Sequence, residues 1–268
     1  MLLNQKHICW NITTRCNATC SFCHRMNNVY ELPYSLNNAI LDKLINCGVR
    51  RITWTGGEAL LYHELDSLIK KSKENGVINH LITNGKAFTV ERMNKLAPML
   101  DIVTLSLDSC DSETNEKMGR GKNQYQEISS IVSYLRQYYP HLKTKLNTVA
   151  CKMNIGNLAE ISDFIMHNSI DRWKIFRFMD LRGDAIVHKD DFWITSQEFE
   201  DLKSQINKIL IPKNYHGYAF VDINDFEEDY ILIRADGAIV VTRNKKDLIL
   251  GNLLFDDMID VLSRNNIC

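Results

Sequence analysis

Short apolar segments alternate with amphipathic segments over the first two thirds of this chain, and this alternation limits the possible folds more than any other feature. Strands are expected at residues 7–12, 50–55, 77–83, 101–107, 142–150 and 172–179. Helices are expected at residues 36–46, 63–75, 89–97, 124–139 and 157–168. Strands that alternate with helices pair in parallel through right-handed crossovers, and the helices cover the outer face. Six such strands favour an α/β fold, an open, partial (β/α)6 barrel rather than a closed barrel of eight.

The pattern changes after residue 183. Helices are expected at residues 196–209 and 255–263. Between them, two apolar stretches flank Asp236-Gly237, a dipeptide typical of tight hairpin turns. We therefore predict a core domain at residues 1–183 and a C-terminal extension at residues 184–268. The extension contains the β-hairpin and acts as a lid or closes the barrel.

The charge balance restricts the classes of partner. Lys and Arg number 32 against 33 Asp and Glu, so no overall field attracts the chain to nucleic acid or to an acidic membrane. An anionic ligand must therefore be held by a local group of cations. No apolar run approaches the roughly 20 residues that cross a bilayer, and the first residues lack the apolar region of a signal peptide. We expect a cytoplasmic protein without nucleic acid or membrane partners, while the oligomeric state stays open.

Three cysteines stand at the spacing C-x3-C-x2-C in the loop after the first strand: Cys16, Cys20 and Cys23. Three thiolates from one loop can bind three irons of a [4Fe-4S] cluster and leave the fourth iron open for a reaction. A zinc site with His24 as fourth ligand is the alternative, although zinc sites usually combine two such halves and this sequence shows one. Disulfides are disfavoured, because no secretory segment precedes the motif.

Polar residues follow the next three strands, and parallel strands bring such residues together at one mouth of a barrel. They are Gly56-Gly57-Glu58, Thr83-Asn84-Gly85 and Ser106. Each group on its own is also typical of a turn or a helix cap. Phe22, between two of the cysteines, could shield a cluster, contact an adenine or pack in the core. Arg120, in a Gly-Arg-Gly loop, could pair with a ligand carboxylate or lie in solvent.

Charged residues occur on two of the expected strands. Lys145 and Asn147 share one face of their strand, and Arg172 and Lys174 share one face of the next. In a helix-covered barrel a strand side chain points into the helix layer or into the lumen, and isolated charge is costly in the helix layer. The lumen is therefore favoured, and several cations there require an anion such as a triphosphate. Lys143 and Arg172 could instead mark strand starts in solvent.

Together, the cysteine triad and Gly56-Gly57-Glu58 resemble the radical S-adenosylmethionine (SAM) enzymes, and later motifs resemble one branch of them, the viperins. The later motifs are Leu105–Ser109, Gly119–Gly121, Thr144–Val149, Arg172–Phe176 and Asp229–Leu232. The resemblance implies a partial barrel of the radical SAM type, a [4Fe-4S] cluster held by the three cysteines, and SAM at the open iron. It also implies that SAM contacts Phe22, Gly56, Gly57, Glu58, Thr83, Asn84, Ser106 and Arg120.

The resemblance to viperins further implies a reaction. Viperins of this kind convert CTP to 3′-deoxy-3′,4′-didehydro-CTP, a chain terminator for viral polymerases. A 5′-deoxyadenosyl radical derived from SAM removes hydrogen from ribose C4′, the 3′-hydroxyl leaves, and an electron and a proton complete the product. By matching position, Lys145, Arg172 and Lys174 would bind the triphosphate, and Asn147 would be a further substrate-binding residue. Tyr230 would approach the sugar and donate in the last step, and a reductase or flavodoxin-type partner would supply electrons.

The chain departs from the viperin pattern around the motifs. Cys9 stands where viperins usually carry an asparagine that helps to position the substrate, Asn11 replaces a histidine, and Ala59 replaces a proline. Another nucleoside triphosphate therefore stays open as the substrate, as does a different small metabolite or a peptide. A zinc-stabilised nucleotide-binding or interaction module without catalysis is the alternative from another functional class.

Overall fold

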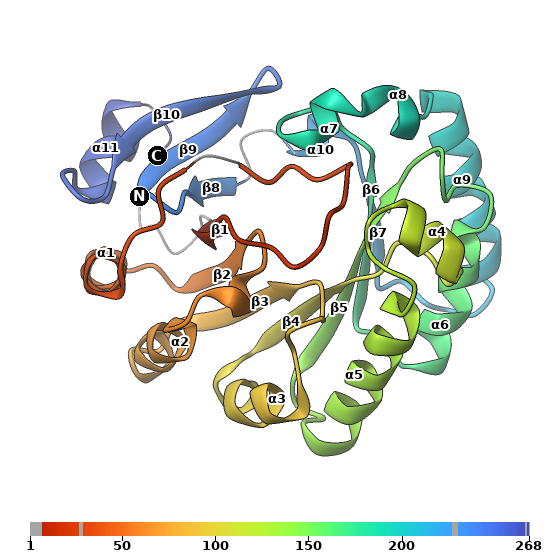
Figure 1. Ribbon diagram of the computed structural model, residues 1–268, viewed down its shortest axis with the longest axis horizontal. Coiled ribbons are helices and arrows are strands. Elements are labelled where there is room, and N and C mark those ends of the chain that lie inside the picture. The colour runs from red at the N-terminus through yellow and green to blue at the C-terminus, as the bar shows by residue number, and fades with distance from the viewer. Residues whose placement is uncertain (1–6, 27–28, 227–229, 266, 268) are drawn as a thin grey trace.

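A computed structural model of the chain describes residues 7–26, 29–226, 230–265 and 267 (Figure 1). The strands are β1 (His7–Thr13), β2 (Arg51–Gly56), β3 (Ile78–Thr83), β4 (Ile102–Ser106), β5 (Lys143–Ala150), β6 (Arg172–Arg177), β7 (Tyr218–Val221), β8 (Tyr230–Ile233), β9 (Ala238–Arg243) and β10 (Lys246–Asn252). The α-helices are α1 (Tyr34–Asn46), α2 (Leu65–Glu74), α3 (Val90–Leu96), α4 (Ser112–Lys117), α5 (Gln124–Tyr138), α6 (Ile161–His167), α7 (Asp184–Val187), α8 (Lys189–Phe192), α9 (Ser196–Leu210), α10 (Ile223–Phe226) and α11 (Met258–Arg264). Short 3-10 helices are η2 (Ala59–Leu61), η3 (Ala97–Met99) and η4 (Leu158–Glu160).

The strands form one sheet in the order β10-β9-β8-β1-β2-β3-β4-β5-β6-β7. Every pair from β8-β1 to β6-β7 is parallel, and β8-β9 and β9-β10 are antiparallel. Because β10 and β7 are its two edges, the sheet of the described residues does not close. Figure 1 shows it curving around an interior, with α1, α2, α3, α5 and α6 on the outer side. The predicted α/β partial barrel is confirmed.

Side chains alternate along the barrel strands between an apolar outer face and an inner face that carries most of the polar groups. In β1, Ile8 and Trp10 are fully buried in the core between sheet and helices, and the ring of Trp10 stacks on Trp54 of β2 at 5.3 Å between centroids. The intervening Cys9 and Asn11 instead line the barrel interior. The core thus lies between the sheet and the helices, and the interior is lined by polar groups together with a few apolar ones, namely Ile82, Phe176 and Leu232.

Residues 184–268 extend the sheet at both edges. Strand β7 pairs with β6, and β8 pairs with β1 on the opposite side of the barrel. The hairpin predicted around Asp236-Gly237 is formed by β8 and β9, and Gly237 has the positive φ of +80° that such a turn requires. The domain boundary at residue 183 and the role of the extension as a lid stay predictions.

Nothing in the sequence predicts β7, β10 or α4. The residues of β7 and β10 are mostly half-buried or exposed, so neither strand carries the alternation that marks one buried face. Helix α4 is short and polar, and it begins where the Asp111 carboxylate accepts the N–H of Thr114 at 2.7 Å. Within the described ranges, no helix is both long and apolar enough to cross a bilayer.

Candidate active site

The loop that follows β1, residues 14–26, forms the cysteine loop. A cavity of about 160 Å³ at the carboxyl ends of the barrel strands is lined by Cys16, Cys20 and Cys23. Backbone N–H groups of the loop point at two of these sulfurs. The N–H of Ala18 donates to Cys16 Sγ at 3.4 Å, and the N–H of Arg25 donates to Cys23 Sγ at 3.3 Å. Such bonds favour negative charge on sulfur, which is the form that binds iron.

Two glycines let neighbouring turns approach the backbone of the cysteine loop. A Cβ atom at Gly57 would lie 2.3 Å from the carbonyl oxygen of Arg15, and a Cβ at Gly119 would lie 2.4 Å from that of Thr19. Gly119 also has a φ of +81°, and its carbonyl accepts the N–H of Thr19 at 3.1 Å. A side chain at either position would displace the loop. The Gly-Gly-Glu and Gly-Arg-Gly turns therefore fix where the cysteines stand.

Glu58 joins the ends of β2 and β3. Its buried carboxylate accepts the hydroxyl of Thr83 at 2.7 Å, the N–H of Asn84 at 2.8 Å and the N–H of Leu60 at 3.2 Å. Burial raises the pKa of Glu58, and these hydrogen bonds oppose the rise. A carboxylate has about four acceptor positions, so three protein donors leave room for a further donor from a ligand. Gly56 and Gly57 line the same cavity beside it.

Asn84 faces the cysteines from the end of β3. Its Nδ2 lies 3.7 Å from Cys16 Sγ and donates to Asn17 Oδ1 at 2.8 Å. Its carbonyl is held by Gln124, whose Nε2 donates both to Asn84 O at 2.8 Å and to Ser106 O at 2.9 Å. Gln124 therefore ties the ends of β3 and β4 together. No sequence pattern indicates this role, since one Gln at the start of a helix is common.

Arg120 lies in the wall of the cysteine cavity rather than in solvent. Its side chain is 13% exposed, its Nε contacts Asp108 Oδ2 at 2.6 Å, and its guanidinium carbon lies 5.2 Å from the ring centre of Phe22. Phe22 packs in turn against Phe192 at 5.6 Å between centroids. We expected Phe22 to shield a cluster, contact an adenine or pack in the core, and its described contacts are those of core packing. Arg120 keeps a fixed positive charge beside the cysteines.

The donor set fits an iron–sulfur cluster. Burial raises the pKa of the Cys20 thiol to about 11 and also raises that of Cys23, while the charge of Arg120 opposes both shifts. Thiols lose their protons on binding metal, so loading this site releases protons. No three His, Cys, Asp or Glu side chains of the described residues converge on a point that would hold a single ion. A cluster has no such requirement, because each thiolate binds a different iron.

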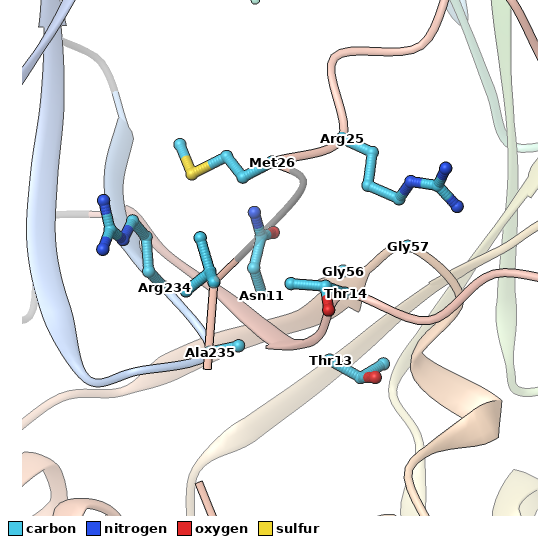
Figure 2. A pocket seen from close by; sticks show the side chains of 10 residues that line it. Asn11, Thr13, Thr14, Arg25, Met26, Gly56, Gly57, Arg234 and Ala235 are labelled. Atoms are coloured by element: carbon cyan, nitrogen blue, oxygen red, sulfur yellow. The ribbon is translucent and has the colours of Figure 1, made fainter. Parts of the chain in front are cut away.

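A small pocket lies on the other side of the Gly56-Gly57 turn. Figure 2 shows Arg25 and Met26 of the cysteine loop on one side of it and Arg234 and Ala235 of the β8-β9 turn on another. The carbonyl of Ala235 accepts the N–H of Leu32, at 3.0 Å. The C-terminal extension therefore contacts the chain shortly after the cysteine loop.

A larger cavity of about 320 Å³ occupies the barrel interior. It adjoins the cysteine cavity, because the two are both lined by Cys23, Thr55, Gly56 and Ile82. We call the larger one the lumen cavity. A molecule bound there would lie next to a molecule bound at the cysteines.

Cations line the lumen cavity, whereas no Asp or Glu is among the described residues of its wall. The cations are Arg25, Lys145, Lys174 and Arg182. Arg182 is balanced by Asp247 at 2.7 Å. Burial lowers the pKa of Lys145, and the nearby charges of Arg51, Arg172, Lys174 and Lys143 lower it further. The cavity therefore favours an anion.

Most of the predicted substrate residues come together, with two exceptions. Lys145, Asn147 and Lys174 line the lumen cavity, but Arg172 is exposed at the start of β6 and is not part of its wall. The charge of Arg172 nevertheless helps to lower the pKa of Lys145. The side chain of Tyr230 lies outside the described part of the structure. Its backbone lies in β8, where it pairs with His7 of β1, two residues before Leu232 of the cavity wall.

Three buried residues of the lumen cavity are not indicated by any motif. Thr53, His80 and Thr104 come from β2, β3 and β4, and the imidazole of His80 lies between the two hydroxyls. Strand alternation does place each of them on the inner face. Their contacts with one another depend on the register of three strands, which a single sequence does not define.

Residues 10–165 match the family model described as the Radical SAM superfamily. The chain belongs to this superfamily. It is 27% identical over 256 residues to an S-adenosylmethionine-dependent nucleotide dehydratase of Flammeovirga pacifica, and the match covers 91% of this chain and 83% of that protein. A protein of the same name from Lacinutrix mariniflava is 30% identical over 215 residues, which are 74% of this chain and 44% of that protein.

Among solved structures, Streptococcus suis SuiB bound to S-adenosylmethionine shares the fold with a TM-score of 0.75 at 18% identity, over 95% of this chain and 64% of SuiB. Radical SAM enzymes use a [4Fe-4S] cluster and SAM, so this chain is an enzyme with these cofactors. The cysteine cavity lies where the expected cofactor residues meet: all of them except Phe22 line it.

Proposed function

We propose that this radical SAM enzyme dehydrates a nucleoside triphosphate, with CTP as the first candidate, to its 3′-deoxy-3′,4′-didehydro analogue. The observation that carries the proposal is the lumen cavity, whose described wall residues include cations but no carboxylate, and which adjoins the cysteine cavity. Relatives named nucleotide dehydratases, aligned over most of this chain, support the same substrate class. An antiviral role through a chain-terminating nucleotide would follow from that product.

The cofactors would occupy the cysteine cavity. Cys16, Cys20 and Cys23 would hold the [4Fe-4S] cluster, which together with SAM supplies the 5′-deoxyadenosyl radical. Glu58 has an acceptor position left for the SAM ammonium, and Arg120 offers a fixed cation to its carboxylate. Thr83, Asn84 and Ser106 would complete the contacts with SAM from the ends of β3 and β4.

The substrate would occupy the lumen cavity. Lys145, Asn147 and Lys174 would bind the triphosphate directly, and Arg172 would add its charge from outside the wall. Held in this way, the ribose would lie toward Thr55 and Ile82, where the two cavities meet, so that its C4′–H bond faces the SAM side. Fixed orientation and exclusion of water are what this chain contributes to the chemistry.

The product assay tests the proposal. Protein reconstituted under anaerobic conditions is incubated with SAM, a reductant and each nucleoside triphosphate in turn. One triphosphate should stimulate formation of 5′-deoxyadenosine and yield a nucleotide that has lost one water. If none does, the substrate class is wrong, and a peptide or another metabolite becomes the candidate. A colourless protein that binds zinc but no iron would also contradict its assignment as a radical SAM enzyme.

A matched pair of variants shows whether the lumen cavity is the site. Lys145→Gln removes a cation from its wall, and Lys143→Gln removes an exposed one from the start of the same strand. Binding of the active triphosphate should weaken strongly in the first variant and little in the second. The electron donor is sought separately, by replacing the chemical reductant with flavodoxin and its reductase.

A further inference from the structure

The segment that follows β6, residues 178–185, lies between the cysteine loop and the hairpin of β9 and β10. On one side, the imidazole Nε2 of His24 lies 2.6 Å from the carbonyl oxygen of Met179. On the other side, the side chain of Arg182 reaches a hydroxyl of β9. Strands β6 and β9 stand far apart in the order of the sheet. Arg182 therefore links the two sides of the open barrel, at the lumen cavity that it lines.

Two side chains of the hairpin hold the guanidinium of Arg182. Its Nη2 donates to Asp247 Oδ1 at 2.7 Å and to Thr242 Oγ1 at 2.9 Å. The hydroxyl of Thr242 donates in turn to Asp247 Oδ1 at 3.0 Å. The side chain of Arg182 is 14% exposed. Because the three groups bond to one another in a closed triangle, the guanidinium has a defined orientation.

The other two nitrogens of this guanidinium have no acceptor among the described residues. Nε is fully buried without a partner, whereas Nη1 makes no described hydrogen bond and keeps some accessible surface. Asp247 lines a different pocket, together with Gly183 and Arg234, and Arg182 is not part of that wall. Arg182 lines the lumen cavity instead, with Thr242. Nη1 is therefore the donor that a ligand in the lumen cavity can reach.

The ion pair distinguishes Arg182 from the cations expected to bind the triphosphate. Asp247 offsets its charge, so a phosphate would have to compete with a carboxylate for the guanidinium. The charges that act most on the pKa of Lys145 are, by contrast, all positive. An uncharged acceptor needs no such competition, because a paired guanidinium still donates from its other nitrogens. Arg182 therefore suits a neutral carbonyl oxygen better than a phosphate.

The nucleotide placement described under the proposed function leaves the base near Arg182. Lys145 stands near the start of β5, whereas Arg182 follows the end of β6. The triphosphate leaves the ribose at C5′ and the base leaves it at C1′, so the two groups extend in different directions. With the triphosphate toward Lys145 and C4′ toward the cysteine cavity, the wall left for the base includes Phe176, Leu232 and Arg182. The first two offer apolar surface to a flat ring.

We propose that Arg182 reads the base of the bound nucleotide, by donating a hydrogen bond from Nη1 to the O2 oxygen of a pyrimidine. O2 is a neutral acceptor, and it is bonded to the carbon next to the glycosidic nitrogen, so it stays close to the ribose. The inference rests on the proposed function, because it needs a nucleotide in the lumen cavity. Arg182 is then a specificity-determining residue. Asp247 and Thr242 are positioning residues, because they act through it.

Two ligands that differ in one atom test this contact. Binding of CTP and of 2-thiocytidine triphosphate is measured by calorimetry on the cluster-loaded protein, with SAM and no reductant. The ligands share their phosphates and ribose, and the sulfur at C2 accepts hydrogen bonds only weakly. The wild-type protein should bind CTP at least about tenfold more tightly, since the lost bond has a charged donor.

Two variants assign this preference to its donor. Arg182→Met keeps a side chain of similar reach without a donor, and it should bind the two nucleotides within about twofold of each other. A penalty caused by the larger size of sulfur would persist in this variant. The control is Arg234→Met, which removes an arginine that pairs with Asp236 and lies outside the lumen wall. It should keep the preference of the wild-type protein.

Several results would overturn the proposal. Equal binding of both nucleotides by the wild-type protein shows that O2 receives no hydrogen bond, and this result does not depend on how well Arg182→Met folds. An undiminished preference in folded Arg182→Met assigns it to another group. If the product assay identifies a purine triphosphate as the substrate, the proposed function stands and this inference is wrong. If no nucleoside triphosphate stimulates formation of 5′-deoxyadenosine, the proposed function is wrong and this inference with it.

Discussion

The carboxylate of Asp108 contacts the guanidinium Nε of Arg120 at 2.6 Å in the wall of the cysteine cavity, and both side chains are largely shielded from water. The second carboxylate oxygen of Asp108 accepts the N–H of Val149 at 2.7 Å. The pair therefore connects the end of β4, the Gly-Arg-Gly turn and β5. It holds a positive charge at a fixed place beside the cysteines.

Replacement of Asp108 by Asn should destabilise the protein by about 3–5 kcal/mol, because it leaves the buried guanidinium of Arg120 without a counter-charge. Urea unfolding of the unloaded protein measures this change. The control is Glu200→Gln, which breaks the exposed pair of Glu200 with Lys203 and should change the free energy of unfolding by less than about 1 kcal/mol. Equal effects of the two substitutions would show that the buried ion pair contributes no more to the free energy of unfolding than the exposed pair does.

A methyl group at Gly119 should displace the cysteine loop. In Gly119→Ala the new Cβ would meet the carbonyl of Thr19, whereas Gly76→Ala has a similar φ of +74° and nothing within 4 Å of its Cβ. Gly76→Ala should therefore show only the strain of a left-handed backbone, about 1–2 kcal/mol. Gly119→Ala should in addition reduce the iron bound after reconstitution. Equal iron contents in two equally folded variants would contradict the contact.

Nucleotide binding should weaken as Lys145 loses its proton, and it should do so at a lower pH than it would with a lysine of ordinary pKa. Its pKa is lowered from 10.5 by burial and by neighbouring cations. An anion binds the protonated form, so affinity is complete below the pKa of the free protein and decreases as pH rises through it. Titrations with CTP at pH 8 to 10 measure the decrease. In Lys145→Arg the charge persists, so a decrease of the same size there would assign it to another group.

Tyr230→Phe tests the predicted donor. Loss of the hydroxyl should leave 5′-deoxyadenosine formation unchanged while the yield of dehydrated nucleotide falls, because only the last step needs the donor. The two yields are compared by mass spectrometry from one reaction. A full yield of product from the variant would exclude this role for Tyr230.

The sequence predicts this fold well where the strand pattern is strong. Ile8 and Trp10 alternate with Cys9 and Asn11 in β1, and this pattern alone separates the helix-covered core from the polar interior. The strand-end motifs also predict correctly that Glu58 and the cysteines meet at one cavity. These predictions succeed because local spacing and the direction of parallel strands are enough to make them.

Other parts of the site depend on contacts between distant segments. Arg120 is buried because the Gly119 turn packs on the cysteine loop and because Asp108 lies beside it. The position of His80 between two threonines depends on strand register. Arg172 shares a strand face with Lys174 but lies outside the lumen wall, because the strand begins in solvent. Spacing along the chain does not contain this information.

The central claim is that the lumen cavity holds a nucleoside triphosphate with its ribose toward SAM. The most direct test is a reaction of the reconstituted protein with CTP that carries deuterium at C4′, followed by mass analysis of the 5′-deoxyadenosine. The account predicts that the deuterium is transferred to the 5′-deoxyadenosine. Formation of unlabelled 5′-deoxyadenosine in the same amount with and without CTP would contradict it.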